Sequence, residues 1–254
     1  MKSISLTYKT LLPLQWKNLS LEAGFCLSHV SFQNLKEDPS SFLHPLEEAY
    51  FSGLSHPRRQ HSYLLGRYCA KQAIKAYCND VDLKDIAIES GIFDHPVVTY
   101  MPGSPLQVSI SHTDTLGTAL AFPEIHPMAI DVEAICPSKA DAIKSQLSPA
   151  EQKLWFYLRK EKSDEATQLT VLWTVKEALS KALKCGLTVP FEVLEIEIIR
   201  EQEGFVISTF KNFKQYQALS FCLDAHVCSI VYPIHTSFKI DVENIKKNLQ
   251  ERYP

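Results

Sequence analysis

The stretch Leu172-Trp173-Thr174-Val175-Lys176-Glu177-Ala178-Leu179-Ser180-Lys181-Ala182-Leu183-Lys184 organises the second half of this 254-residue chain. Its apolar side chains recur at helical spacing and form one stripe, at Leu172, Val175, Leu179, Ala182 and Leu183. A second face carries Trp173, Glu177, Lys181 and Lys184. The spacing predicts an amphipathic helix from about Asp164, with its apolar stripe in a core. Cys185-Gly186 closes this helix, because glycine is the usual residue just past a helix end.

The charged face of this helix has two interpretations. Glu177 and Lys181, four residues apart, suit a solvated face on which an ion pair contributes only about 0.2–0.5 kcal/mol. An acidic strand upstream suggests another role. Asp131 and Glu133 lie two apart in the strand expected over residues 127–133, so both carboxylates point to one face. If the helix packs across this strand, Glu177 adds a third carboxylate.

Three carboxylates could form either a solvated strand end or a cation site. Burying adjacent carboxylates without partners is costly. A set of carboxylates without histidine or cysteine ligands is what a hard ion such as Mg²⁺ accepts. Mg²⁺ keeps positions for waters and substrate phosphates, so the set implies a phosphate-bearing substrate. Lys181, one turn beyond Glu177, is placed to contact that substrate.

The composition narrows the class of protein. A hydrophobic content of 45% and a charged content of 22% are ordinary for a globular protein, and the net charge of -3 argues against nucleic-acid binding. The seven cysteines are scattered and form no C-x-x-C pair, which favours reduced thiols. No apolar run approaches the roughly 20 residues that span a bilayer, and the start lacks a signal-peptide core. We expect a soluble cytoplasmic protein without a membrane segment.

The first half of the chain carries its own long helix, expected from His56 to about Cys78. Arg58 and Arg59 fall in its first turn, where the helix dipole does not favour cations. They are either solvated or placed to capture an anion together with backbone N–H groups. Farther along, a strand over residues 106–111 ends in His112, with an antiparallel neighbour expected over 118–122.

The second half repeats this plan. Leu147-Ser148-Pro149-Ala150-Glu151 predicts a capping box at the start of a helix. Ala70-Lys71-Gln72-Ala73-Ile74 aligns without gaps with Val175-Lys176-Glu177-Ala178-Leu179, at an offset of 176 − 71 = 105 residues. So short a match can arise by chance; otherwise it indicates two related α+β lobes joined near residues 113–126. We place the lobes at residues 1–115 and 116–254.

Two segments together resemble a known family. Ala129-Ile130-Asp131-Val132-Glu133 and Trp173-Thr174-Val175-Lys176-Glu177-Ala178-Leu179-Ser180-Lys181 are similar to the signature motifs of the 4′-phosphopantetheinyl transferases, most closely of the surfactin-synthetase-activating type. Those motifs read roughly [VI]-G-[VI]-D-x-E and [FW]-[STC]-x-K-E-[AS]-x-x-K. The second fits at every specified position. The first departs at Ala129, where glycine is usual, which concerns backbone packing and touches no ligand.

Other segments resemble the family's coenzyme A contacts. Arg58 stands where the family has an arginine for coenzyme A. Gly91-Ile92-Phe93-Asp94-His95-Pro96 looks like the family's G-x-x-x-K-P loop with His95 in place of lysine, and histidine titrates near neutral pH. Ser109-Ile110-Ser111-His112 looks like N-[LVI]-S-H, with Ser109 in place of Asn. The resemblance assigns Ser111 and His112 to phosphate contacts, whereas a lone histidine at a strand end is more often a surface or capping residue.

The resemblance implies a monomer of two similar α+β lobes related by a pseudo-twofold axis, with the active site between them. It implies transfer of the 4′-phosphopantetheine arm of coenzyme A to a serine of an apo acyl or peptidyl carrier protein, with release of adenosine 3′,5′-bisphosphate. Mg²⁺ would be held by Asp131, Glu133 and Glu177. Coenzyme A would be held by Arg58, His95, Ser111, His112 and Lys181. Catalysis would fall to Asp131, Lys181 and Glu177, the last being the candidate base for the incoming serine.

Two other functions are compatible with the residues alone. One is a non-enzymatic two-lobed protein that binds a nucleotide or an acidic partner and carries the carboxylates as surface charge. The other is a different Mg²⁺-dependent phosphoryl or nucleotidyl transferase. If the chain is a 4′-phosphopantetheinyl transferase, its acceptor could be a carrier protein of fatty-acid, polyketide or peptide synthesis, or a dedicated lysine-pathway acceptor.

Overall fold

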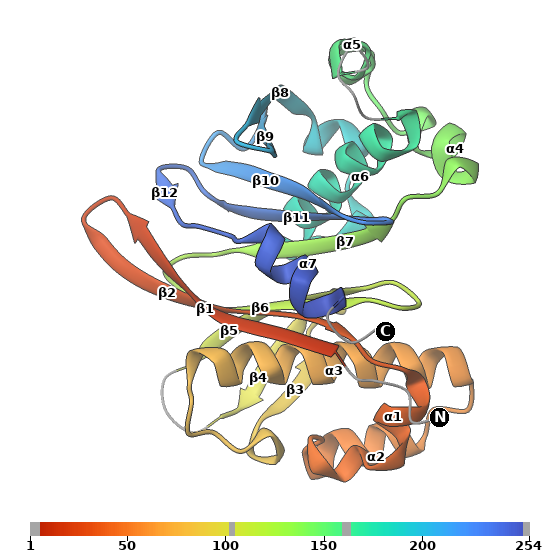
Figure 1. Ribbon diagram of the computed structural model, residues 1–254, viewed down its shortest axis with the longest axis vertical. Helices are drawn as coiled ribbons and strands as arrows, with labels where there is room; N and C mark the ends of the chain where they lie inside the picture. The colour runs from red at the N-terminus through yellow and green to blue at the C-terminus, as the bar shows by residue number, and fades with distance from the viewer. Residues whose placement is uncertain (1–5, 102–104, 159–163, 251–254) are drawn as a thin grey trace. The chain divides into compact units, whose positions relative to one another are not determined.

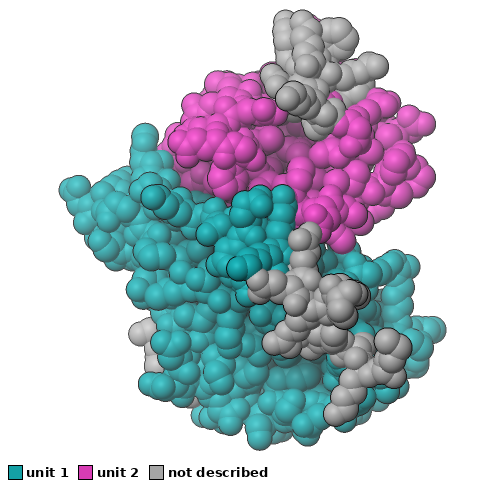
Figure 2. Space-filling model, in the orientation of Figure 1, with its two compact units in different colours: residues 1–127, 235–254 teal, residues 128–234 magenta. Residues whose placement is uncertain are grey.

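The computed structural model describes residues 6–101, 105–158 and 164–250 (Figure 1). The chain divides into unit 1, residues 1–127 with 235–254, and unit 2, residues 128–234 (Figure 2). This division differs from the boundary expected between residues 115 and 116. Strand β6 (Gly117–Pro123) pairs with strands of unit 1 on both edges, and the end of the chain returns to pair with strand β1 (Leu6–Trp16).

Unit 1 is built on an antiparallel five-stranded sheet. Its strands are, in spatial order, β12 (Thr236–Ser237), β1, β2 (Leu19–His29), β6 and β5 (Leu106–His112). Helix α3 (Pro57–Tyr77) packs along this sheet and contacts four of its strands (Figure 1). The remaining elements are a hairpin of β3 (Ala87–Ser90) and β4 (Pro96–Tyr100), and helices α1 (Phe32–Glu37), α2 (Pro45–Ser52) and α7 (Val242–Gln250).

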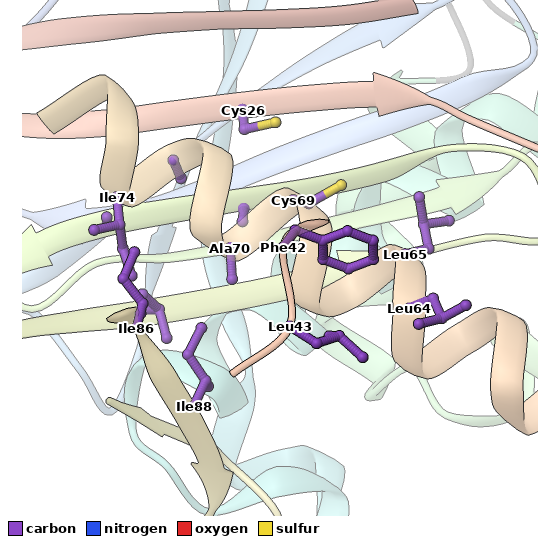
Figure 3. Packing of buried hydrophobic residues seen from close by; sticks show 14 of the residues in the cluster. Cys26, Phe42, Leu43, Leu64, Leu65, Cys69, Ala70, Ile74, Ile86 and Ile88 are labelled. Carbon is purple, nitrogen blue, oxygen red and sulfur yellow. The ribbon is translucent and has the colours of Figure 1, made fainter. Parts of the chain in front are cut away.

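Helix α3 packs against other elements on two sides. Its side chains pack between Cys26 of the sheet and Ile86 and Ile88 at the start of the hairpin (Figure 3). The approach to β2 is so close that a Cβ at Gly24 would lie 1.9 Å from the carbonyl oxygen of Ala73. Only glycine allows this crossing, because any side chain would overlap the helix backbone.

Unit 2 is built on a second five-stranded sheet. Its antiparallel sheet has the order β7 (Ala129–Ala134), β11 (His226–Pro233), β10 (Tyr216–Leu223), β9 (Phe205–Phe210) and β8 (Ile196–Gln202). Helix α6 (Glu165–Ala182) packs on β7, β10 and β11, and it is accompanied by α4 (Ala140–Ser145) and α5 (Pro149–Leu158) (Figure 1). Phe191–Leu194 is a 3₁₀ turn that follows Pro190, and β8 begins after it, at Ile196. No helix in the described parts of the chain has both the length and the apolarity to cross a bilayer.

The two units run through the same order of elements. Each has a strand, two short helices, a long helix, a hairpin and two further strands, so β2-β6-β5 corresponds to β7-β11-β10. The strand register agrees: Cys26 pairs with Ala119, and Asp131, 105 residues later, pairs with Ser229. Gly24 is likewise 129 − 24 = 105 residues before Ala129. The expected α+β class with two similar units is confirmed, whereas their relation by a pseudo-twofold axis stays a prediction.

The repeated five-residue segments, 70–74 and 175–179, each contain a buried lysine. In unit 2, Lys176 Nζ donates to Glu151 Oε2 at 2.7 Å and to the carbonyl oxygens of Phe191 at 3.2 Å and Gln146 at 3.4 Å. Both charged side chains are fully buried. Glu151 Oε2 also accepts the N–H of Ser148 at 2.9 Å, which confirms the predicted capping box.

Lys71 makes the corresponding contacts in unit 1. Its Nζ lies 2.5 Å from Glu47 Oε2 and donates to the carbonyl oxygen of Phe42 at 2.6 Å. Glu47 closes a capping box with the N–H of His44, and its other oxygen accepts the N–H of Ile88 at 3.0 Å. In unit 2 that last role falls to the N–H of the first residue of β8, 2.9 Å from Glu151 Oε1. The repeated segment therefore supplies, in each unit, the lysine of a buried ion pair that joins the long helix, a short helix and a strand.

Candidate active site

Strand β7 and helix α6 bring together the acidic and basic residues singled out in unit 2. Asp131 and Glu133 lie on β7 opposite Ser229 and Val227 of β11, and alternation puts both carboxylates on one face. Helix α6 begins at Asp164, as predicted, because the Asp164 carboxylate accepts the N–H of Thr167 at 3.0 Å. From there α6 runs across β7 and β11 and carries Glu177 and Lys181 toward the strand carboxylates.

The end of α6 differs from the expected one. The helix ends at Ala182, and Lys184, not the expected Gly186, takes the first left-handed conformation, with φ 54°. The N–H of Cys185 then bonds the carbonyl of Ser180 at 3.1 Å, and that of Lys184 bonds the carbonyl of Lys181 at 3.1 Å. This bond pair is the one that ordinarily forms around a glycine at this position. It closes the last turn of the helix, in which Lys181 lies.

Lys181 pairs with the strand. Its Nζ donates to Asp131 Oδ1 at 2.7 Å, a charge-assisted hydrogen bond between a partly exposed ammonium and a carboxylate that is only 4% exposed. Glu133, at the more open end of β7, pairs with Lys139 at 3.0 Å. The strand carboxylates therefore face cations from two elements, α6 and the turn that follows β7.

Glu177 is the most perturbed carboxyl of this group. Burial raises its pKa to about 7, with a further rise from the negative charge of Asp131 and a smaller one from Glu133, while Lys181 opposes the shift. The negative charges of Asp131 and Glu133 therefore add to the effect of burial on the pKa of Glu177. A carboxyl with a pKa near 7 exchanges a proton readily at neutral pH, which is the property a general base requires.

The three carboxylates Asp131, Glu133 and Glu177 offer only oxygen donors. In the described ranges, no three His, Cys, Asp or Glu side chains gather into a group that could hold a metal ion. Asp131 and Glu133 are paired with Lys181 and Lys139. The chemistry nevertheless suits Mg²⁺, since only carboxylate oxygens are offered. A divalent cation would also offset the negative charges of Asp131 and Glu133, which add to the effect of burial on the pKa of Glu177.

A second group of predicted residues lies in unit 1, where α3 meets the end of β5. Arg58 NH2 lies 3.6 Å from Asp114 Oδ1, and both side chains are exposed. His112 Nε2 shares a hydrogen bond of 2.7 Å with Ser62 Oγ. Ser111, next to His112 on β5, is buried. Two residues of α3, Arg58 and Ser62, therefore contact Asp114 and His112. His112 is the last residue of β5, and Asp114 follows it in the chain.

His95 lies elsewhere in unit 1, in the loop between β3 and β4. The loop is closed by a bond of 2.8 Å from the N–H of Gly91 to the carbonyl of His95. The ring packs beneath Gly91, where an added Cβ would lie 2.4 Å from His95 Cε1. His95 therefore packs within its own loop, against Gly91.

The sequence reasoning missed Ser62, Asp114 and Lys139. Ser62 had a signal, because it lies four residues after Arg58 and therefore on the same face of α3. Asp114 and Lys139 are turn residues, whose partners depend on how each turn folds back. No spacing rule would have found them.

The comparisons with known proteins are consistent with this site. Residues 127–231 match the model of the 4′-phosphopantetheinyl transferase superfamily. The matched segment is nearly that of unit 2, and it contains Asp131, Glu133, Glu177 and Lys181. The match supports the superfamily; assignment to the surfactin-synthetase-activating type stays a prediction. Comparison with curated proteins returned no match.

Three solved structures are similar to part of the chain. A holo-(acyl-carrier-protein) synthase from Bacillus anthracis str. Ames, in complex with CoA (3′,5′-ADP), is 19% identical with a TM-score of 0.34, covering 39% of this chain and 92% of that chain. Holo-ACP-synthase from Plasmodium yoelii is 16% identical with a TM-score of 0.33, over 47% and 96%. Thermotoga maritima holo-[acyl-carrier-protein] synthase is 21% identical with a TM-score of 0.34, over 46% and 70%.

Proposed function

We propose that this chain is a 4′-phosphopantetheinyl transferase that modifies a serine of an apo acyl or peptidyl carrier protein, with coenzyme A as the donor. The observation that carries the proposal is that the superfamily match falls on the segment with the interacting carboxylates and Lys181. The repeated plan of two units in one chain and the two sequence motifs favour the surfactin-synthetase-activating type. Seven free thiols suit a reducing compartment such as the cytoplasm, and we propose a monomer because both units lie in one chain.

The residues of unit 2 supply what the transfer needs. The serine oxygen attacks the phosphorus that bears the pantetheine arm, and the bond from that phosphorus to the adenosine 3′,5′-bisphosphate oxygen breaks. Glu177, directly or through a bound water, is the candidate base for the serine proton. Bound Mg²⁺, held by Asp131, Glu133 and Glu177, would supply charge neutralisation on the diphosphate oxygens.

Lys181 has a second role in this proposal. Its ammonium is held against Asp131 and remains partly exposed, so it can contact an incoming pyrophosphate. In unit 1, Arg58, Ser111, His112 and His95 would bind the nucleotide end of coenzyme A. A guanidinium fork and a histidine are both suited to phosphate oxygens.

The test is incubation with coenzyme A, Mg²⁺ and a panel of apo carriers, read by intact-protein mass. Asp131→Ala and Glu177→Ala should nearly abolish modification while the protein stays folded. Asp141→Ala, which removes a fully exposed carboxylate from α4, is the matched control and should be active. Near-normal rates in both site variants would remove the metal proposal.

The alternative functions are separated by a thermal-shift measurement. A ligand that binds only the folded state raises the melting temperature. Stabilisation by coenzyme A that increases with Mg²⁺, and exceeds stabilisation by ATP, supports the transferase. A preference for ATP would favour another phosphoryl or nucleotidyl transferase. Binding without any modified carrier would favour the non-enzymatic protein.

A further inference from the structure

Three fully buried hydroxyl groups connect helix α6 to the sheet of unit 2. We propose that Thr174 of α6 and Ser229 of β11 are positioning residues, which fix the place of Glu177 relative to the carboxylates of β7. The effect on catalysis rests on the proposed function. The contacts do not: the hydroxyl oxygens of Thr174 and Ser229 lie 2.7 Å apart, and those of Ser229 and Ser220 are also 2.7 Å apart.

The hydroxyl groups form one chain with a defined direction. Thr174 Oγ1 donates to the carbonyl oxygen of Val171 at 3.1 Å, which uses its single hydrogen. Ser229 therefore donates to Thr174, and Ser220 donates to Ser229. All three side chains are buried from solvent, so a hydroxyl that loses its acceptor cannot bond to bulk water instead. The chain joins β10, β11 and α6 through bonds that are costly to break.

This chain of hydroxyls lies next to the candidate active site. Ser229 is the ladder partner of Asp131 and also of Ser220, so these three side chains project from one face of the sheet in a row. Thr174 is three residues before Glu177 on α6, and residues at this spacing are neighbours on a helix surface. A shift or rotation of α6 over this row would therefore move Glu177 relative to Asp131.

Unit 1 packs its long helix on its sheet with other side chains. The positions that correspond to the three hydroxyl residues, at the offset of 174 − 69 = 105 along the helix and at the same places in the strand ladder, are Cys69, Ala119 and Ile110. Cys69 and Ala119 are fully buried, so this crossing of helix and sheet needs no hydroxyl for packing. Unit 1 also has Cys26 in the place of Asp131 and Gln72 in the place of Glu177. The hydroxyls thus occur in the unit that has carboxylates to align.

Two variants of the full chain separate positioning from stability. Thr174→Val keeps the shape of the side chain but removes the acceptor of Ser229. The triple variant Thr174→Val, Ser229→Ala and Ser220→Ala removes every hydroxyl of the chain and leaves none without a partner. Replacing all partners of a buried hydrogen bond by apolar groups is nearly neutral for stability. Thr174→Val should lower the urea midpoint, and the triple variant should recover most of that loss.

Turnover should not recover with stability. In the carrier-modification assay, Thr174→Val and the triple variant should both lower kcat roughly 10- to 100-fold, since a misplacement of about 1 Å can cost roughly 100-fold. The KM for coenzyme A should stay within about 3-fold, and Thr174→Ser, which keeps the hydroxyl, should restore kcat. A triple variant with the kcat of the wild type would overturn the positioning role.

Ser208→Ala is the matched control. Ser208 is a fully buried residue of β9 in the same sheet, and its hydroxyl has no hydrogen-bond partner in the described part of the chain. Its removal deletes a buried hydroxyl without breaking the chain that reaches α6. The Ser208→Ala variant should therefore keep both kcat and KM, and a loss of kcat as large as that of Thr174→Val would overturn the proposal.

A second measurement does not depend on coenzyme A. Amide hydrogen exchange over residues 175–182 of α6, the part that carries Glu177, should be faster in Thr174→Val and in the triple variant than in the wild type. Unchanged exchange there would overturn the positioning role. If the wild-type chain modifies no carrier, the proposed function fails, and exchange alone then decides whether the hydroxyl chain holds this part of α6 in place.

Discussion

Replacing Lys176 by methionine should destabilise unit 2 far more than a surface change would. The substitution keeps much of the side-chain volume but removes the ammonium that faces Glu151. Glu151 would then keep a buried negative charge with only the N–H groups of Ser148 and Ile196 as partners. Removing one member of a buried ion pair costs about 3–5 kcal/mol. For a unit of this size that is roughly 10–20 °C in melting temperature.

The internal repeat provides the control. Lys71→Met breaks the corresponding pair with Glu47 in unit 1, where Arg67 Nε still lies 3.5 Å from Glu47 Oε1, so it should cost less and act on the other unit. Urea unfolding followed by circular dichroism, with calorimetry to resolve two transitions, would assign each loss to its unit. The double variant Lys176→Met with Glu151→Gln also removes the negative charge of Glu151, which has lost its cationic partner. The glutamine side chain keeps an oxygen that can accept a backbone N–H. It should recover part of the lost stability.

Two results would refute this reasoning. A loss below about 1 kcal/mol for Lys176→Met would mean either that the pair is solvated, contrary to its complete burial, or that Glu151 takes up a proton, as burial favours for a carboxyl without a cationic partner. A double variant less stable than Lys176→Met alone would mean that Glu151 acts chiefly as a cap and hardly as a charge partner. Either outcome would also weaken the interpretation of Lys71 in unit 1.

Three further predictions concern single sites. Gly24→Ala should destabilise unit 1 severely, since the new Cβ would lie 1.9 Å from the Ala73 carbonyl oxygen, and folding yield with urea midpoints would measure it. Burial lowers the pKa of His126, which bonds the Thr236 hydroxyl at 2.8 Å. The unfolded chain therefore binds the proton more readily, so His126 contributes stability above about pH 6.5 that is lost as the pH falls toward its folded pKa. Urea midpoints between pH 7 and pH 5 should fall more steeply for wild type than for His126→Gln. Lys181→Ala should weaken coenzyme A binding or turnover, which titration calorimetry and the carrier assay would detect; unchanged values would exclude a pyrophosphate contact.

Local patterns were sufficient to predict much of this protein. The periodicity of residues 172–184 predicted α6 from about Asp164, and the capping box at Ser148 predicted the start of α5, because such signals act within one or two turns of a helix. The two-residue spacing of Asp131 and Glu133 put both carboxylates on one face of a strand for the same short-range reason. The repeat of residues 70–74 at residues 175–179 was visible in the sequence, but the buried ion pair that it forms in each unit was not.

Tertiary structure decided which residues became partners. Lys181 is 50 residues from Asp131, and its pairing with that carboxylate depends on how α6 crosses β7. The sequence suggested no strand over residues 6–16, and it placed the end of the chain in the second lobe, whereas β12 returns to pair with β1. Pairing between distant strands leaves no local pattern, because its free energy comes from burial and register in the assembled sheet. The sequence therefore predicted individual helices and strands and the charged residues on them. Only the packing of these elements determined which charged residues became partners.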